Sequence, residues 1–132
     1  EIQAAVLGVG LSHLNETNDI RMGIARKYLR GINHPKVKLP KTANEASHVF
    51  HLFPVMADDR KKFQDYLLEH GVMTQVHYPI PPYAAECYKY QGHSLEEFPN
   101  AAYIAAHEVS LPLYAGMPDE EVEYVIKVVN TY

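Results

Sequence analysis

The chain has 132 residues, of which 47% are hydrophobic and 21% charged, and its formal net charge is −4. This length suits a single domain with a real core, and this composition is typical of a globular protein rather than a disordered one. The mildly acidic balance provides no basic surface for nucleic acid or an anionic membrane, so we expect neither partner.

The N-terminal segment is predicted to be helical. Apolar residues recur every three to four positions from residue 2 to about residue 29, which indicates helix. Gly8 and Gly10 each cost on the order of 1 kcal/mol relative to alanine inside a helix. Since residues 15–19 also offer capping side chains, we expect a bend or two helices. Residues 31–35 then form a loop.

Three segments are predicted to be extended in the first two thirds of the chain. Residues 37–39 form a short strand, and residues 47–56 form a stronger one that is apolar on both faces, as in a covered sheet or a domain interface. Pro54 cannot donate a hydrogen bond, so we expect that strand at an edge or at a bulge. Residues 72–77 form the next strand.

A helix is predicted between the last two of these strands. Asp58 or Asp59 caps its start, and Gly71 supplies a left-handed stop. Its buried stripe is Phe63, Tyr66 and Leu67.

The C-terminal third continues with short elements. We expect a short helix over residues 82–90, a polar loop over 91–98, a helix from Pro99 to about residue 109, and an extended segment over 110–113. Pro118 and the acidic residues after it begin a last helix, where the helix dipole favours negative charge. The apolar face of that helix is Val122, Val125, Ile126 and Val129. The order predicts an α/β fold with a small sheet of about three strands packed with helices.

Residues 76–82, Val-His-Tyr-Pro-Ile-Pro-Pro, are predicted to form a rigid corner at a strand end. Three prolines fix φ and remove backbone donors, so the segment is neither a helix interior nor a central strand. Such corners often present side chains to a ligand, and Tyr83, Tyr88 and Tyr90 add flat amphipathic surface nearby. The alternative is a structural turn that only redirects the chain.

Residue types that could carry chemistry have simpler explanations. His48 and His51 lie at an odd spacing on an expected strand, so they would point to opposite faces and could not share a metal ion. The carboxylates of residues 58–59, 96–97 and 119–123 fall at predicted helix starts or in a loop, where dipole interactions and solubility account for them. We therefore expect no metal site.

Nucleotide-loop and nucleophile motifs are missing from the sequence, since it contains no GxGxxG, Walker or GxSxG pattern. Cys87 is the only cysteine, which excludes an internal disulfide and favours a passive thiol in a cytoplasmic setting. The apolar run over residues 4–11 is too short to span a bilayer, and no basic region precedes it as in a signal peptide. Because the chain begins at Glu1 within a helical pattern, we expect part of a longer polypeptide.

Several stretches together match one known pattern in order and spacing. They are residues 1–7 (EIQAAVL), Arg21 with 25–28 (ARKY), 47–53 (SHVFHLF), 67–71, 76–81 (VHYPIP), 98–101 (FPNA), 110–113 (SLPL) and 122–126. Over essentially its whole length the chain resembles the C-terminal part of DegT/DnrJ/StrS-type sugar aminotransferases, which are fold-type I enzymes that use pyridoxal 5′-phosphate. One departure is Pro54, where the family usually has a β-branched or aromatic residue.

The resemblance implies an α+β small domain like that of aspartate-aminotransferase-like enzymes, with a largely antiparallel sheet, over residues 32–132. Residues 1–31 are then a helical bridge from a large domain. In the family the lysine that binds the cofactor lies upstream of the position matching Glu1, and Lys27, Lys41 and Lys89 do not match it. We therefore expect no catalytic or cofactor-binding residue here and no pyridoxal phosphate bound to this fragment, which should be inactive by itself.

The resemblance also implies a role for the parent enzyme. It would be a cytoplasmic homodimer that transfers an amino group from a donor to a nucleotide-linked keto-sugar for surface polysaccharide or related glycans. His77 and Tyr78 are expected to lie near the substrate, at the mouth of the active site. The alternatives are a dehydratase of the same family and a non-catalytic binding module.

Overall fold

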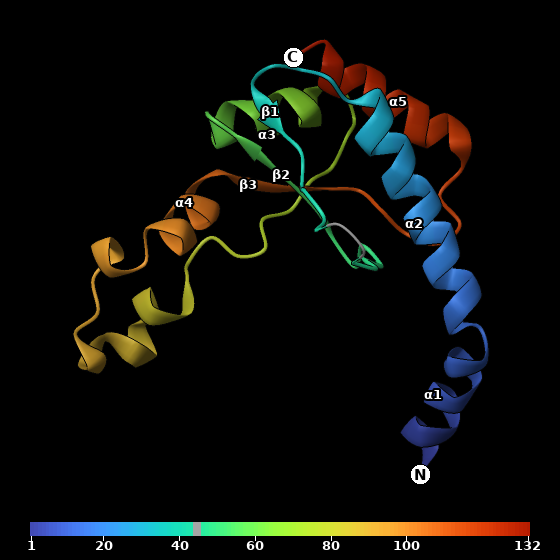
Figure 1. Cartoon of the computed structure of the whole chain (residues 1–132), viewed down its shortest axis with the longest axis horizontal. Coiled ribbons are helices and arrows are strands. Elements are labelled where there is room, and N and C mark those ends of the chain that lie inside the picture. The colour runs from blue at the N-terminus through green and yellow to red at the C-terminus, as the bar shows by residue number, and fades with distance from the viewer. Residues whose placement is uncertain (44–45) are drawn as a thin grey trace.

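A computed structural model describes residues 1–43 and 46–132, and Figure 1 shows their arrangement. The helices are α1 (Ile2–Ser12), α2 (Leu14–Gly31), α3 (Arg60–Glu69), α4 (Pro99–His107) and α5 (Asp119–Asn130), and the short 3₁₀ helices are η1 (Pro82–Ala84), η2 (Glu86–Gln91) and η3 (Leu95–Glu97). The strands are β1 (Val37–Lys38), β2 (Phe53–Ala57) and β3 (Glu108–Leu111). They form an antiparallel sheet in the order β1-β2-β3. The predicted α+β class is therefore confirmed.

The core lies between the sheet and three helices. Helices α2 and α5 pack side by side, and α3 packs against β2 and β3. Strand β2 buries alternate residues, and the apolar face predicted for α5 is buried as expected. Tyr28 of α2 sits in this core, edge-on to Phe53 at 5.0 Å between ring centroids, and its hydroxyl donates to the carbonyl of Pro112 at 2.8 Å.

The expected interruption of the N-terminal helix occurs at His13, between α1 and α2. Helix α1 has no charged and no buried residue, whereas α2 contributes Ile24, Ala25 and Tyr28 to the core. Among the described helices, none combines the length and the apolar character that a bilayer crossing requires.

Strand β2 is shorter and more central than expected. The prediction that it lies at an edge is wrong, because β1 and β3 flank it on both sides. Pro54 is tolerated because it lies opposite Ser110, whose backbone N–H and C=O both bond to Gln75 on the far side of β3. Pro54 therefore occupies a non-hydrogen-bonded pair, and β1 reaches only Met56 and Ala57 of β2. The missing N–H costs no ladder bond.

The segment before β2 is irregular rather than extended. Phe50 is buried with a positive φ of 50°, and Arg21 donates to the carbonyls of Phe50 and His51. The ring Nδ1 of His48 accepts from the backbone N–H of Phe50 at 2.9 Å. His48 and His51 therefore lie outside any strand, and the prediction that they point to opposite faces of one is wrong. In the described parts of the chain no three metal-ligating side chains gather.

The predicted strand over residues 72–77 is reduced to one bridge, in which Gln75 pairs with Ser110. The local signals of the preceding helix are confirmed, because Asp59 accepts from the N–H of Lys62 and Gly71 has a φ of 74°.

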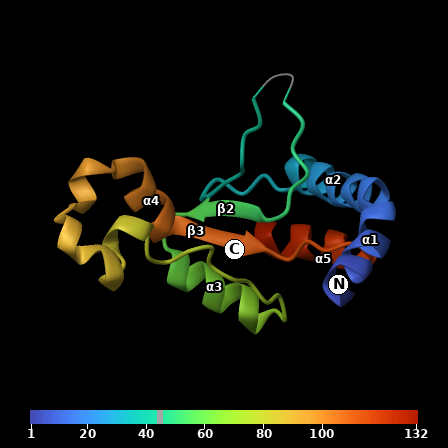
Figure 2. The same cartoon turned by 90° about the horizontal axis from the view of Figure 1, so that it is seen from below.

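Residues 82–107, which we call the arm, extend away from the sheet in both views (Figures 1 and 2). The expected helix over residues 82–90 is replaced by two 3₁₀ helices, η1 and η2, and the expected loop over 91–98 contains η3. A capping box holds η3: the Glu97 carboxylate accepts from the N–H of Ser94 at 2.8 Å, and that bond, with the one from His93, lowers the Glu97 pKa. Helix α4 ends at His107, two residues early, because Glu108 enters β3.

Candidate functional site

The candidate site is the corner at His77 and Tyr78, directly after the bridge at Gln75. His77 is half-buried, while Tyr78 is 72% exposed. The two rings stand edge to face at 5.5 Å between centroids, and the peptide bond that joins the residues is cis. The corner thus presents one anchored imidazole and one free phenol side by side.

The imidazole is anchored by two residues of β3. The backbone N–H of His77 donates to Oε2 of Glu108 at 2.7 Å, and its ring Nδ1 lies 2.9 Å from Oγ of Ser110. The Ser110 hydroxyl in turn donates to Oε1 of Glu108. Glu108 and Ser110 are 1% and 5% exposed. A closed set of hydrogen bonds therefore joins the corner to the sheet.

This network accounts for the burial of the Glu108 carboxylate. A carboxylate that leaves water without partners is strongly destabilising, but here each oxygen of Glu108 accepts one bond. The ladder that starts at the pair Gln75 and Ser110 would next join His77 to Glu108. The side chain of Glu108 accepts the hydrogen bond that the Glu108 carbonyl would accept in a regular ladder. The backbone of residue 77 can therefore leave the sheet while its N–H remains bonded.

A pocket of about 490 Å³ adjoins this corner. It lies between the proline segment and α4, and its lining is almost wholly apolar. The lining residues are Tyr78, Ile80, Pro81, Pro82, Ala101, Ile104 and Ala105. Such a surface suits the flat faces of a sugar or a base, with a polar group supplied by the hydroxyl of Tyr78, the residue that follows His77.

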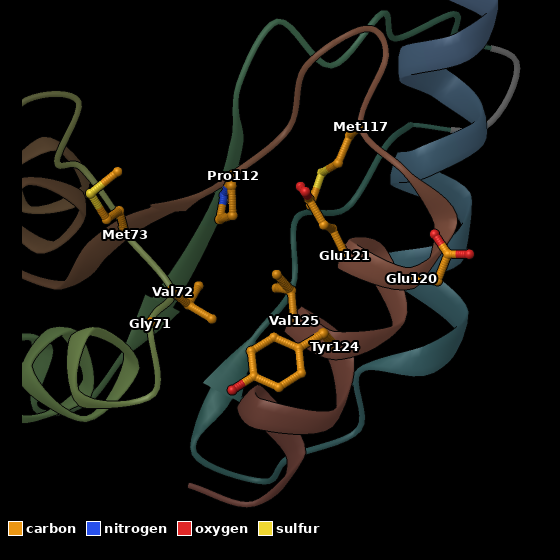
Figure 3. Close-up of a pocket in the computed structure, with 9 residues that line it drawn as sticks. All are labelled: Gly71, Val72, Met73, Pro112, Met117, Glu120, Glu121, Tyr124 and Val125. Atoms are coloured by element: carbon orange, nitrogen blue, oxygen red, sulfur yellow. The ribbon is translucent and has the colours of Figure 1, made fainter.

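A second pocket, also of about 490 Å³, lies between α5 and the segment after α3 (Figure 3). Two of its polar side chains, Tyr124 and Glu121, already have partners within the chain. Tyr124 donates to the carbonyl of His70 at 2.9 Å, and Glu121 accepts from Tyr114 at 2.6 Å, a bond that raises the Tyr114 pKa. We therefore place the candidate site at the His77 corner.

Two of the lysines considered in the sequence, Lys27 and Lys89, form ion pairs at the surface. Lys27 pairs with Asp119 at 2.6 Å, and Lys89 pairs with Glu86. The lining of the pocket beside Tyr78 contains no lysine, arginine or carboxylate. These residues do not fit pyridoxal phosphate, which needs an amine for its aldehyde and donors for its phosphate.

Glu108 and Ser110 were missed as site residues in the sequence. Glu108 was expected inside a helix, and both lie more than 30 positions from His77 along the chain. A local signal does exist: in residues 108–111, Glu-Val-Ser-Leu, polar and apolar side chains alternate as on a strand. That alternation places Glu108 and Ser110 on one face of β3.

Comparison with known proteins gives a consistent result. The sequence model of the "DegT/DnrJ/EryC1/StrS aminotransferase family" matches residues 1–130. A dTDP-3-amino-3,6-dideoxy-alpha-D-galactopyranose transaminase from Aneurinibacillus thermoaerophilus is 42% identical over 132 residues, which are 100% of this chain and 36% of the relative. The chain thus spans about a third of that relative's length.

Solved structures agree with the sequence match. The structure of DesV from S. venezuelae in complex with a ketimine intermediate superposes with a TM-score of 0.93 at 32% identity, over 98% of this chain and 35% of DesV. The PLP-form of Spr1654 from Streptococcus pneumoniae superposes with a TM-score of 0.80 at 25% identity, over 93% of this chain and 33% of Spr1654.

Proposed function

The chain belongs to the DegT/DnrJ/EryC1/StrS aminotransferase family, and from this we propose that it is the C-terminal part of an enzyme that aminates a nucleotide-linked keto-sugar. The observation that carries the proposal is the match over the whole chain to a dTDP-sugar transaminase at 42% identity. The superposition on DesV supports the same assignment. An apolar pocket beside a polar corner is the kind of surface such a substrate needs.

Pyridoxal phosphate belongs to this proposal as the cofactor of the whole enzyme, since a family member has been solved in its PLP-form. When bound, it supplies the electron sink that amino-group transfer requires. Because the pocket lining does not fit the cofactor, we assign its lysine and phosphate contacts to the other two thirds of the enzyme. The His77 corner and the pocket beside it are then assigned to contact with the sugar substrate.

His77 and Tyr78 are the residues that we assign to substrate contact. The exposed ring of Tyr78 offers a face for a sugar or a base. His77 holds a polar atom at a fixed place beside it, because the network with Glu108 and Ser110 restrains both its backbone and its ring.

We further propose that residues 1–31 form a bridge to the rest of the enzyme and residues 32–132 its small domain. Helix α1 is apolar on every side and buries no residue in this chain, a pattern that requires cover by other protein. Helix α2 ties the bridge to the small domain through Ile24, Ala25 and Tyr28. A cytoplasmic homodimer is part of the same proposal, and its mass in solution tests it.

The test uses the full-length gene product. We expect a yellow protein that transfers an amino group from glutamate to a dTDP-linked keto-hexose. Replacing His77 or Tyr78 by alanine should raise KM for the sugar about tenfold or more, while Tyr90→Ala, an 80% exposed residue of the arm, should not. A colourless protein, or one that removes a sugar hydroxyl without forming an amine, contradicts the proposal.

A further inference from the structure

The hydrogen bonds around His77 fix which ring nitrogen carries its proton. Both oxygens of Glu108 accept, one from the His77 backbone N–H and one from the Ser110 hydroxyl. Because the single hydroxyl proton of Ser110 is used on Glu108, Oγ can only accept at its contact with the imidazole. Nδ1 of His77 must therefore carry a proton.

The other ring nitrogen is then free to accept in the neutral imidazole. Among the described residues Nε2 of His77 has no hydrogen-bond partner, and it is not among the side-chain atoms buried without one. It is therefore open to a ligand at the corner. A free neutral histidine favours the opposite tautomer, with its proton on Nε2, so the network reverses the ordinary preference.

We propose that Glu108 and Ser110 are positioning residues that hold His77 as the Nδ1–H tautomer, so that Nε2 accepts a hydrogen bond from a hydroxyl of the bound sugar. This inference rests on the proposed function for the identity of the ligand. The backbone N–H of His77 donates to Glu108, and the His77 ring contacts Ser110, which donates to the same carboxylate. Together these bonds fix both the position and the protonation of the imidazole. A substrate hydroxyl therefore meets a lone pair in a fixed direction, at little cost in side-chain ordering.

The first test is the tautomer in the ligand-free full-length protein, observed by ¹⁵N NMR above about pH 8, where an ordinary histidine is neutral. His77 is assigned from the signals that are lost in His77→Asn. The chain supplies its own references. His107 and His70 lie with Nδ1 at 2.8 Å from backbone carbonyls and must protonate it, whereas Nδ1 of His48 accepts from a backbone N–H.

We expect His77 to resemble His107 and His70, with Nδ1 protonated and Nε2 bare. The variant Glu108→Gln should reverse this. Its amide oxygen keeps the bond to the His77 N–H, and its NH₂ now donates to Ser110, whose hydroxyl proton turns to Nδ1. A wild-type His77 that resembles His48 overturns the inference, because the proton would then enter the network from Glu108. An unchanged tautomer in Glu108→Gln overturns it too.

The second test is calorimetric binding of a dTDP-linked hexose to the full-length protein. We expect Ser110→Ala to weaken binding about fivefold, the effect of one misplaced hydrogen bond, while Tyr90→Ala binds as wild type does. If the wild-type protein does not bind the sugar nucleotide, the proposed function fails while the tautomer result stands. If it binds and Ser110→Ala binds equally well, the role inferred for Ser110 fails.

Discussion

The carboxylate of Glu108 replaces a strand partner for His77. Its Oε2 accepts the His77 backbone N–H at 2.7 Å, at the position where the ladder begun by Gln75 and Ser110 would otherwise continue. The chain can leave the sheet at this point without losing a hydrogen bond. These bonds to β3 hold the start of the proline corner, and with it the start of the arm, in a fixed position.

This relationship predicts the effect of removing the carboxylate. Glu108→Ala leaves the His77 N–H and the Ser110 hydroxyl without their acceptor, so we expect a loss of about 2 kcal/mol in the free energy of unfolding. Glu108→Gln keeps one acceptor oxygen and should cost about half as much. Urea unfolding followed by circular dichroism measures both values. Equal stability of Glu108→Ala and the wild-type protein would show that the network does not hold the corner.

The close approach of α2 and α5 predicts opposite effects at two glycines. A Cβ added at Gly31 would lie 2.9 Å from two atoms of Ile126, which is buried, whereas a Cβ at Gly23 meets nothing within 4 Å. We expect Gly31→Ala to destabilise the protein by about 1–3 kcal/mol through overpacking. Gly23→Ala should stabilise it by up to about 1 kcal/mol, since alanine is the better helix former.

Thermal unfolding of both variants checks these signs. Gly23→Ala is the matched control, because both glycines belong to α2 and both changes add one methyl group. A Gly31→Ala variant as stable as Gly23→Ala would mean that α5 moves aside without cost.

Local sequence signals were sufficient for the elements whose ends are fixed by their own residues. The cap at Asp59, the left-handed Gly71 and the apolar face of α5 lie where the sequence predicts them. Each depends on interactions within a few positions along the chain, so pattern and propensity carry the information.

Tertiary contacts decided the elements that were predicted incorrectly. Residues 47–52 have a strand-like composition, but Arg21, about 30 positions earlier, binds the carbonyls of Phe50 and His51 and keeps them out of the ladder. Residues 72–77 pair with β3 only at Gln75, because the Glu108 side chain rather than its backbone binds the N–H of His77. The prolines predicted a rigid corner and the family resemblance named His77 and Tyr78 within it. The contacts of Glu108 and Ser110 with His77 span more than 30 positions along the chain, so no local pattern predicted them.

The buried hydroxyl of Tyr83 predicts a stabilising substitution. This oxygen has no hydrogen-bond partner in the described parts of the chain, and its ring packs on Phe98 at 4.7 Å between centroids. Tyr83→Phe keeps the ring contact and removes the unpaired polar atom, so we expect unchanged stability or a gain of up to about 1 kcal/mol. A loss of stability in urea unfolding would reveal a water or protein partner for the hydroxyl.

Tyr28→Phe is the matched comparison at neutral pH, because the Tyr28 hydroxyl does have an acceptor, the carbonyl of Pro112 at 2.8 Å. Its removal should cost about 1 kcal/mol. If Tyr28→Phe were as stable as Tyr83→Phe, the bond to Pro112 would contribute nothing to the free energy of unfolding.

Tyr28→Phe also tests how the free energy of unfolding depends on pH. Burial raises the Tyr28 pKa well above its ordinary value of 10.0, and the nearby Tyr114 and Glu121 raise it further. The folded state therefore keeps this proton above about pH 10, where the unfolded chain releases it. The contribution of Tyr28 is thus complete below about pH 10 and is lost as the pH rises further, by at most about 1.4 kcal/mol per pH unit.

Urea unfolding between about pH 9 and pH 11 separates Tyr28 from the other tyrosines. Both proteins should lose stability with rising pH, because the pKa values of Tyr114 and Tyr132 are also raised and these residues are present in both. The wild-type protein should lose more, so that the advantage it holds over Tyr28→Phe at pH 9 shrinks or reverses by pH 11. Parallel declines in the two proteins would mean that Tyr28 ionises as readily in the core as in the unfolded chain.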